Sequence, residues 1–453
     1  MKEEFRILSA TAILGYGFPV ESFNAGMERK PHLIAVDAGS TDPGPYYLGA
    51  GVSFTDRDAV KRDLEIMLKA GVQNKIPVAI GSAGGSGAEP HLQWCREIIE
   101  EIAAENNLRF KLAVIHSQMD KGVLKEALAR GDISPLGFAP ELTGAEIDAT
   151  TNIVAQMGVE PFIAAFESAP DVILAGRAYD PSCFAALAIM QGYDPALSLH
   201  LGKILECAAI CAAPGSGSDC MFGYIGEDYF RVEPLNPIRK CTTLSVAAHT
   251  LYEKTNPYIL PGPGGHLDLS GCRFAQETEN IVRVSGTRLV PAERYTVKLE
   301  GAKLIGCRTV SIAGSRDPVM ISVIDEIIKG VKERVDDNFQ GMDWKYDLRF
   351  NIYGRDGVMG ALEPAPSTAG AHELGIIIEA TASDQKQADT ICAFARSTML
   401  HYGYEGRRST AGNLAFPYSP SDFHAGEVYV FSVYHLLSVS DPAGMFPIEF
   451  IEL

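Results

Sequence analysis

Over residues 4–120, short continuous apolar runs alternate with segments whose apolar residues recur at helical spacing. The predicted strands lie at 5–14, 32–36, 76–80 and 111–116, and the predicted helices lie at 56–70 and 90–106. Thr55 is expected to cap the first of these helices and Gly71 to end it. The alternation continues with an apolar run at 170–176 and a helical segment at 182–191. Strands that are apolar throughout and joined by helices are typical of a parallel sheet covered on both faces.

From about residue 221 the pattern changes to short alternating segments rich in glycine and proline, which predict antiparallel strands and turns. Two helical stretches, 320–334 and 383–402, interrupt these segments. The predicted fold class is therefore α/β, with an N-terminal doubly wound, mostly parallel sheet domain followed by a smaller α+β domain. We expect a Rossmann-like domain over 1–220 and a domain with antiparallel strands over 221–453.

Length and composition fit this two-domain organisation. A chain of 453 residues exceeds what one hydrophobic core usually supports, and 46% hydrophobic with 21% charged residues is typical of globular proteins. The apolar runs are far shorter than the roughly 20 residues of a membrane span. The N-terminal segment also lacks the basic region and apolar run of a signal peptide, so a cytoplasmic protein is expected. The nine cysteines are scattered without a C-x-x-C pair, which indicates reduced thiols and no structural zinc.

The formal net charge of −18 restricts the partners of the chain. Nucleic acids and anionic membranes attract clustered lysine and arginine, so neither is an expected partner. A small anionic substrate stays compatible with this charge, because the local charge of a pocket can oppose the overall sign. We expect such a substrate, and a homo-oligomeric protein.

The first candidate site is the loop 37–45, which follows a predicted strand. Ligands of open parallel sheets bind beyond the carboxyl ends of the strands, because free amides and helix N-termini converge there. This loop offers two carboxylates and two hydroxyls, from Asp37, Ser40, Thr41 and Asp42. It is expected to bind a substrate oxyanion or a metal ion, and a tight turn held by its own polar side chains is the alternative.

The second candidate site is the glycine-rich loop 81–87, between a predicted strand and a predicted helix. Its backbone amides and the helix N-terminus suit an anion, which makes Ser82, Gly84, Gly85 and Ser86 expected substrate-binding residues. The spacing fits neither a P-loop nor the dinucleotide motif, and the chain shows no nicotinamide or flavin signature. A purely structural loop is the alternative.

The third candidate site combines the loop 176–182 with the segment 200–207. Arg177 suits a carboxylate, and Asp180 is either a catalytic group or the cap of the following helix. Lys203 and Glu206 are separated by three positions in a very apolar segment. Burial of such a pair predicts acid/base chemistry, and an intrahelical ion pair is the alternative.

The predicted second domain adds His266, in a loop of glycine and proline, as a catalytic candidate. Arg396, Arg407 and Arg408 are expected to bind substrate, with capping of a helix end as the alternative for Arg396. The ten histidines form no metal motif. A divalent metal such as Mg²⁺ is therefore expected only on oxygen ligands, for which Asp37, Asp42 and Glu206 are the candidates.

Several long segments of the chain together resemble the acyclic terpene utilisation (AtuA) family. They are RILSATAILGYG, DAGSTDPGP, GSAGGSGAEPHL, LAGRAYDP, HLGKILECAAICAAPGSGSD, LPGPGGHLDLS, YTVKLEGAKLIGCRT and RSTAGNLAFPYSPSD. The resemblance covers nearly the whole chain. The family takes its name from citronellol and geraniol breakdown, but its members extend beyond that pathway. The resemblance therefore supports the predicted fold and the choice of loops, and it assigns neither a reaction nor a catalytic residue.

These observations favour a lyase of the hydratase/dehydratase type that acts on a small branched or multi-carboxylate acid. Such a reaction needs an anion-binding pocket and a positioned acid or base. One alternative is an enzyme that acts on an acyl-CoA thioester in terpenoid or branched-acid catabolism. Another is a non-catalytic subunit of a carboxylase or mutase, which would associate with a small partner subunit.

Overall fold

The computed structural model describes residues 3–252, 255–364, 370–408 and 411–453. The chain forms two compact units. The first contains Met1–Lys303 and Phe431–Leu453, and the second contains Leu304–Val430. Among the described residues, no helix combines the length and the apolar character needed to cross a membrane.

The first unit is organised around a ten-stranded sheet whose five central strands are parallel, as the apolar runs predict. These strands, in spatial order, are β1 (Phe5–Ser9), β2 (Leu33–Asp37), β3 (Val78–Gly81), β7 (Val172–Ala175) and β4 (Lys111–Ile115). Successive side chains of each strand enter two different cores: Leu33 and Ala35 of β2 face one, and Ile34 and Val36 face the other. Because both faces are covered, every position of β2 is apolar until Asp37.

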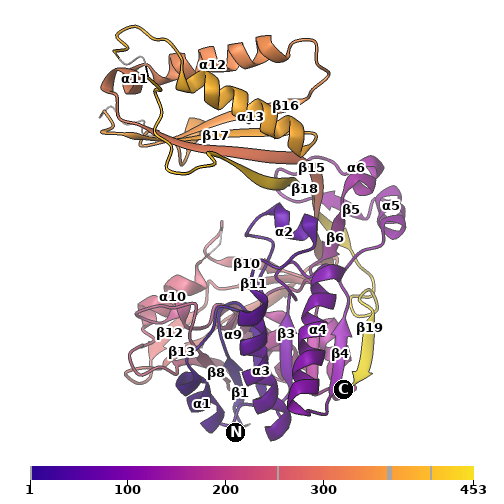
Figure 1. The fold of residues 1–453 in the computed structure, drawn as a ribbon. Coiled ribbons are helices and arrows are strands. Elements are labelled where there is room, and N and C mark those ends of the chain that lie inside the picture. The colour runs from indigo at the N-terminus through magenta and orange to yellow at the C-terminus, as the bar shows by residue number, and fades with distance from the viewer. Residues whose placement is uncertain (1–2, 253–254, 365–369, 409–410) are drawn as a thin grey trace. The chain divides into compact units, whose positions relative to one another are not determined.

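Helices cover the two faces of this sheet (Figure 1). One core contains residues of α1 (Val20–Glu28), α3 (Arg57–Asn74) and α4 (Glu89–Asn106). The other contains residues of α7 (Glu160–Phe166), α8 (Ser182–Met190) and α9 (Pro195–Leu205). The predicted doubly wound α/β arrangement is therefore confirmed. Smaller elements of the connections are α2 (Pro45–Ala50), α5 (Lys121–Arg130), β5 (Ile133–Pro135), α6 (Gly144–Ala149) and β6 (Asn152–Ala155).

Asp56, and not Thr55, caps helix α3. The Asp56 carboxylate accepts hydrogen bonds from the backbone amides of Asp58 and Ala59. The helix also continues past Gly71 to Asn74. A side chain at Gly71 would overlap Val78 of β3, so this glycine permits close packing of helix on strand and does not end the helix.

The predicted boundary at residue 220 is wrong, because the strands that follow it extend the same sheet. β8 (Met221–Ile225) pairs antiparallel with β1, and β9 (Tyr229–Pro234), β13 (Val282–Ser285) and β12 (Arg273–Gln276) continue that edge. At the opposite edge, β19 (Ile448–Glu452) pairs antiparallel with β4. The change of pattern near residue 221 therefore marks a change from parallel to antiparallel strands within one unit.

Residues 208–303 supply the remaining elements of the first unit. A 3-10 helix, η1 (Ala208–Cys211), and α10 (Thr243–Thr250) precede a small antiparallel sheet. That sheet consists of β10 (Ile259–Gly262), β11 (Gly265–Asp268) and β14 (Arg288–Pro291). The long strands β15 (Thr296–Ser315) and β18 (Asp422–Ser438) contain residues of both units, and the first part of β15 pairs with β6.

The second unit is an α+β structure with an antiparallel sheet. β16 (Tyr346–Tyr353), β17 (Leu374–Ala382), β15 and β18 lie next to one another in this order. The predicted helix 320–334 is divided into α11 (Pro318–Ser322) and α12 (Ile324–Phe339), and the segment 383–402 contains α13 (Gln385–Leu400). α12 and α13 lie over the same face of the sheet (Figure 1) and enclose the apolar core of this unit with it. A short 3-10 helix, η2, spans Gly360–Leu362.

Candidate functional site

The three loops predicted to bind ligand meet at the carboxyl ends of β2, β3 and β7. Asp37 ends β2, Ser82 follows β3, and Arg177 follows β7 shortly after Ala175. The Ser82 hydroxyl accepts hydrogen bonds from Arg177 Nη1 at 3.2 Å and from the Ala178 amide at 3.3 Å. Because parallel strands end at the same edge of a sheet, residues distant in the chain form one polar cluster there.

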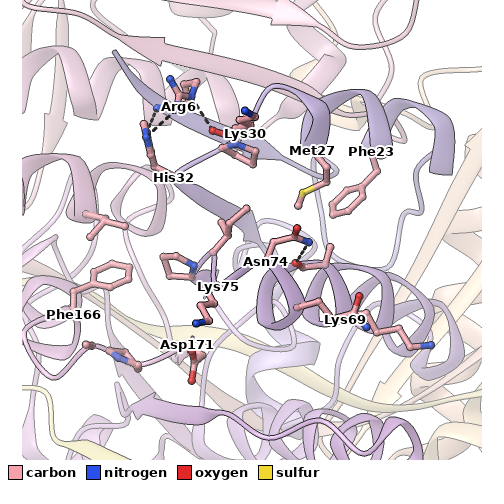
Figure 2. A pocket seen from close by; sticks show the side chains of 18 of the residues that line it. Arg6, Phe23, Met27, Lys30, His32, Lys69, Asn74, Lys75, Phe166 and Asp171 are labelled. Atoms are coloured by element: carbon pink, nitrogen blue, oxygen red, sulfur yellow. Dashed lines mark hydrogen bonds between the residues drawn. The ribbon is translucent and has the colours of Figure 1, made fainter. Parts of the chain in front are cut away.

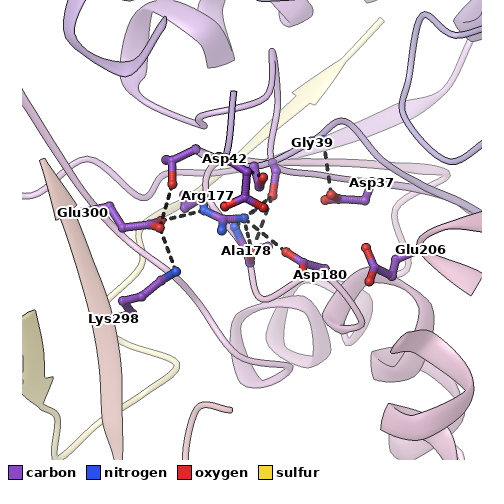
Figure 3. A network of polar contacts seen from close by, with 12 residues as sticks. Asp37, Gly39, Asp42, Arg177, Ala178, Asp180, Glu206, Lys298 and Glu300 are labelled. Atoms are coloured by element: carbon purple, nitrogen blue, oxygen red, sulfur yellow. Dashed lines mark hydrogen bonds and ion pairs between the residues drawn. The ribbon is translucent and has the colours of Figure 1, made fainter. Parts of the chain in front are cut away.

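Arg177 is the centre of this cluster and is almost fully buried. Its Nε donates to Glu300 Oε2 at 2.8 Å, and its Nη1 lies 3.3 Å from Asp180 Oδ1 (Figure 3). Burial alone would lower the pKa of the guanidinium, but the carboxylates of Glu300 and Asp180 raise it. Arg177 therefore stays charged and is held rigidly by acids on two sides.

Glu300 is an essential member of the cluster that the sequence analysis missed. Its carboxylate also pairs with Lys298 Nζ at 2.8 Å and accepts a hydrogen bond from Thr41 Oγ1 at 2.8 Å. Burial raises the pKa of a carboxyl group, but Arg177 and Lys298 lower the pKa of Glu300 to about 2. Thr41, predicted to bind substrate, instead connects the first loop to this buried carboxylate.

Lys203 and Glu206 form the buried pair that their apolar surroundings predict. Lys203 Nζ lies 2.5 Å from Glu206 Oε1 and 3.7 Å from Asp180 Oδ2. Burial opposes the charge of the ammonium group, but Glu206 and Asp180 raise the pKa of Lys203 above its usual value. Asp180 therefore lies between two cations, Arg177 and Lys203. It is not the helix cap that was the alternative, because Pro181 occupies the N-cap position of α8 and this end has no side-chain cap.

Asp37 differs from the other acids because it faces no cation directly. Its Oδ2 accepts a hydrogen bond from the Gly39 amide at 3.2 Å, whereas its Oδ1 is buried and meets no hydrogen-bond partner among the described residues. Burial and the neighbouring Asp180 carboxylate raise the pKa of Asp37 well above its usual range. The carboxyl group of Asp37 is therefore protonated at a pH at which an exposed aspartate is ionised.

The charges of the cluster are consistent with this proton. In the described part of the chain, its buried network contains three acids besides Asp37 and three bases. The acids are Asp180, Glu206 and Glu300, and the bases are Arg177, Lys203 and Lys298. These six charges compensate one another, so an ionised Asp37 would add an unpaired charge to a buried site.

Two adjoining cavities open on the cluster. The acidic cavity, of about 320 Å³, is lined by Asp37, Asp42, Asp180 and Glu206, and Figure 3 shows these carboxyl groups around a common space. The basic cavity, of about 690 Å³, is lined by Arg177, Lys298 and His266. Ser40, Asp42 and Asp180 line both cavities. The cluster therefore places the Asp37 carboxyl group, with its raised pKa, beside a space whose lining includes two cations, a histidine and two acids.

His266, predicted as a catalytic residue of a second domain, belongs to the first unit and reaches this site from β11 of the small antiparallel sheet. It lines the basic cavity together with Gln156 and Tyr179. Its imidazole meets no hydrogen-bonding partner among the residues that the structure describes, so it is available to a ligand.

The glycine-rich loop 81–87 is a packed turn and does not form the predicted anion cradle. All its residues are buried, and the amides of Ser82, Ala83, Gly85 and Gly87 donate to backbone carbonyl oxygens. A Cβ atom at Gly85 would lie 2.5 Å from Phe54 Cε1, and one at Gly84 would lie 2.9 Å from His91 Cβ. The glycines are needed for positive φ angles and close packing. Ser86 is buried in the same turn, whereas the Ser82 hydroxyl accepts a hydrogen bond from the Arg177 side chain.

The three predicted substrate-binding arginines belong to the second unit, and none lines the two cavities. Arg396 forms a two-pronged ion pair with Asp422, with both N–O distances 2.9 Å. Arg407 donates to the carbonyl oxygens of His401 and Ala411 and so closes its own loop. Arg408 is exposed. These contacts give Arg396 and Arg407 roles within the second unit.

The predicted metal ligands Asp37, Asp42 and Glu206 do line one cavity, the acidic one. Across the described ranges, however, no three histidine, cysteine, aspartate or glutamate side chains are arranged closely enough to hold a metal ion. Lys203 already provides a cation beside Glu206 and Asp180.

Comparison with known proteins identifies a family for the chain. No curated protein and no solved structure matches it. The model of the family described as acyclic terpene utilisation family protein AtuA matches residues 56–217 and 239–421. The matched segments contain Arg177, Asp180, Lys203, Glu206 and Glu300 of the cluster. Because the match extends over most of the sequence, the chain belongs to the AtuA family.

Proposed function

We propose that this protein is a hydro-lyase, which adds water to or removes water from a small branched or multi-carboxylate acid. The observation that carries the proposal is the buried carboxyl group of Asp37, whose Oδ1 meets no hydrogen-bond partner among the described residues and which lines the acidic cavity. The adjoining basic cavity is lined by Arg177, Lys298 and His266, and burial with the nearby Asp180 raises the pKa of Asp37. Elimination of water needs a proton for the leaving hydroxyl group and cations for the carboxylate next to the reacting carbon.

A substrate carboxylate would bind in the basic cavity, where Arg177 and Lys298 provide positive charge. Both side chains are already fixed by Glu300, at 2.8 Å in each case, so they need little reordering when substrate binds. Such preorganised charge stabilises the negative charge that develops on the carboxylate during the reaction.

In the proposed reaction, His266 takes a proton from the carbon next to the carboxylate. The electron pair of that C–H bond forms the double bond, the C–O bond breaks, and the leaving hydroxyl group takes the Asp37 proton and departs as water. Return of the proton from His266 to Asp37 through solvent completes the cycle. Asp180, which lines both cavities, separates the acid from the base, and Lys203 with Glu206 positions Asp180.

A ligand screen followed by turnover measurements tests the proposal. Di- and tricarboxylic acids are expected to raise the melting temperature, since a ligand of the native state stabilises it. Hydration or dehydration of the best ligand is then followed by absorbance of the conjugated double bond. The Asp37→Asn variant should lose about 100-fold or more in kcat, because it cannot donate the proton. Asp120→Asn, which only caps a surface helix, is the control.

Three outcomes of this screen would contradict the proposal. Turnover of CoA thioesters, without stabilisation by free acids, would favour an acyl-CoA enzyme. Copurification of a small partner subunit with an inactive chain would favour a non-catalytic role. Undiminished turnover by Asp37→Asn would remove the proposed acid. The screen is repeated with magnesium because Asp37, Asp42 and Glu206, the predicted metal ligands, line one cavity. Light scattering tests the expected homo-oligomer separately.

A further inference from the structure

A third cavity lies at the amino ends of the parallel strands, on the side of the sheet away from the candidate site. It has a volume of about 1160 Å³ and is lined by residues that precede β2, β3 and β7. Figure 2 shows Arg6, Lys30 and His32 on one side of this amino-end cavity and Lys75 with Asp171 on another. None of its lining residues belongs to the acidic or the basic cavity.

The charge of the amino-end cavity opposes that of the chain. Its lining contains four permanent cations, a histidine and only one acid, Asp171, although the net charge of the chain is −18. The four cations are Arg6, Lys30, Lys69 and Lys75. Arg6 and Lys69 pair with Glu3 and Glu65. Lys30 and Lys75 form no ion pair with any described residue, so their charge is available to a ligand.

His32 supplies an independent indication of an anion. Its Nδ1 accepts a hydrogen bond from the Arg6 backbone amide at 3.1 Å, and its Nε2 lies 3.0 Å from Arg6 Nη2. Both neighbours are donors, whereas a neutral imidazole has only one accepting nitrogen. Burial and the Arg6 charge lower the pKa of His32, so the ring is neutral at pH 7. One N–H group of the ring therefore points at a donor.

An anionic oxygen atom of a ligand would give both facing donors, the N–H group of His32 and that of Arg6, an acceptor. With Nδ1 accepting from the Arg6 amide, Nε2 carries the proton, and one anionic oxygen can accept from both His32 Nε2–H and Arg6 Nη2–H. Together with Lys30 and Lys75, these donors provide more positive charge than a single carboxylate would neutralise. Phosphate groups, which carry several anionic oxygens, match this set of donors.

The rest of the lining combines apolar residues with the amide side chains of Asn24, Gln73, Asn74 and Gln191, and it suits the body of a larger molecule. Its apolar lining includes Phe23, Met27, Ile66, Phe166, Leu187 and Met190. The cavity is at least as large as the roughly 300–1000 Å³ of typical small-molecule sites. We propose that the amino-end cavity binds a phosphorylated metabolite of nucleotide size, with its phosphates at Arg6, Lys30, His32 and Lys75.

Calorimetric titration of the full chain with ADP, CoA and inorganic pyrophosphate tests this site. ADP or CoA should bind more tightly than pyrophosphate, because only they fill the apolar part. The variant Lys30→Gln/Lys75→Gln should weaken this binding by about tenfold or more, which corresponds to about 1.4 kcal/mol. Both lysines are exposed, so the variant is expected to fold. The matched control is Lys329→Gln/Lys345→Gln, two exposed lysines of the second unit.

Each remaining outcome would overturn the proposal. No binding of ADP or CoA at about 1 mM would show that the cavity is not a nucleotide-sized site. Equal weakening by the test and control variants would show that only the overall charge matters. Equal affinity for pyrophosphate and ADP would contradict the role of the apolar lining. None of these outcomes bears on the proposed hydro-lyase, because the two sites share no residue.

Discussion

Arg177 Nε donates to Glu300 Oε2 over 2.8 Å, and both side chains are almost completely buried. The pair joins the loop after β7 to strand β15 and fixes the cation around which the candidate site is arranged. Its members depend on each other: removal of either one leaves the opposite charge buried without its main partner, and such a charge is costly.

We therefore expect Glu300→Gln to lower the free energy of unfolding by about 3–5 kcal/mol, because Arg177 and Lys298 lose their common acid. Urea denaturation measures the change. Glu279→Gln, which removes an exposed acid paired with Lys240, is the control and should move the midpoint little. Equal effects of the two variants would show that the buried pair has no special role.

The pH dependence of stability should differ in sign between Glu300 and Asp37. Glu300 has a depressed pKa of about 2, so its stabilising effect is present above the unfolded-state pKa and is lost as the pH falls toward 2. Asp37 has a raised pKa, so its favourable contribution is present below the unfolded-state pKa of about 3.9 and is lost as the pH rises.

Asp37→Asn should therefore gain stability relative to the natural chain as the pH rises from 5 to 9. Melting curves of both proteins across this range measure the difference, and each unit of pKa shift corresponds to about 1.4 kcal/mol. A difference that does not change with pH would mean that Asp37 is ionised throughout, and the proposed proton donor would be lost with it.

Lys203→Met tests whether the buried ion pair is needed for chemistry or only for architecture. The substitution leaves Glu206 and Asp180 without the ammonium group that lies 2.5 Å and 3.7 Å from them. We expect stability to fall by about 3 kcal/mol and kcat by about 100-fold or more. The double variant Lys203→Met/Glu206→Gln should recover stability but no turnover. Recovery of both would make the pair purely architectural.

Gly87→Ala should disturb the candidate site through its backbone. A Cβ atom at residue 87 would overlap the backbone nitrogen of Arg177, and φ there is +68°. We expect a loss of about 1–3 kcal/mol in stability from the strained backbone, and more from the overlap. Gly137→Ala is a matched control, because φ is +62° and nothing lies within 4 Å of the added atom. If both variants melt alike, the contact with Arg177 is unimportant.

The central sheet could be predicted because its physical requirements are local. A strand buried on both faces must be apolar at every position, and Leu33–Asp37 shows this as far as its terminal aspartate. The position of the site followed from the same sheet, since parallel strands direct Asp37, Ser82 and Arg177 to one edge. The buried pair of Lys203 and Glu206 was predictable from the apolar segment around it.

Glu300 could not be predicted, because its role depends on contacts between residues far apart in the chain. It is separated from Thr41 by 259 positions and from Arg177 by 123. The glycine-rich loop 81–87, predicted to bind an anion, is a packed turn for a related reason. Glycines serve both an anion cradle and close packing, and only the placement of Phe54 and His91 against Gly85 and Gly84 distinguishes the two.

The first unit is built from two separate segments of the chain, and the segment that contains β19 is synthesised last. Strand β4 is synthesised long before β19, its antiparallel neighbour, and the whole second unit is translated between them. During that time the backbone groups on one side of β4 lack their final partner, and unpaired strand edges promote association between chains. The nascent chain therefore exposes the unpaired edge of β4 until β19 has been synthesised. A chaperone that binds exposed strands is expected to raise the yield of folded protein.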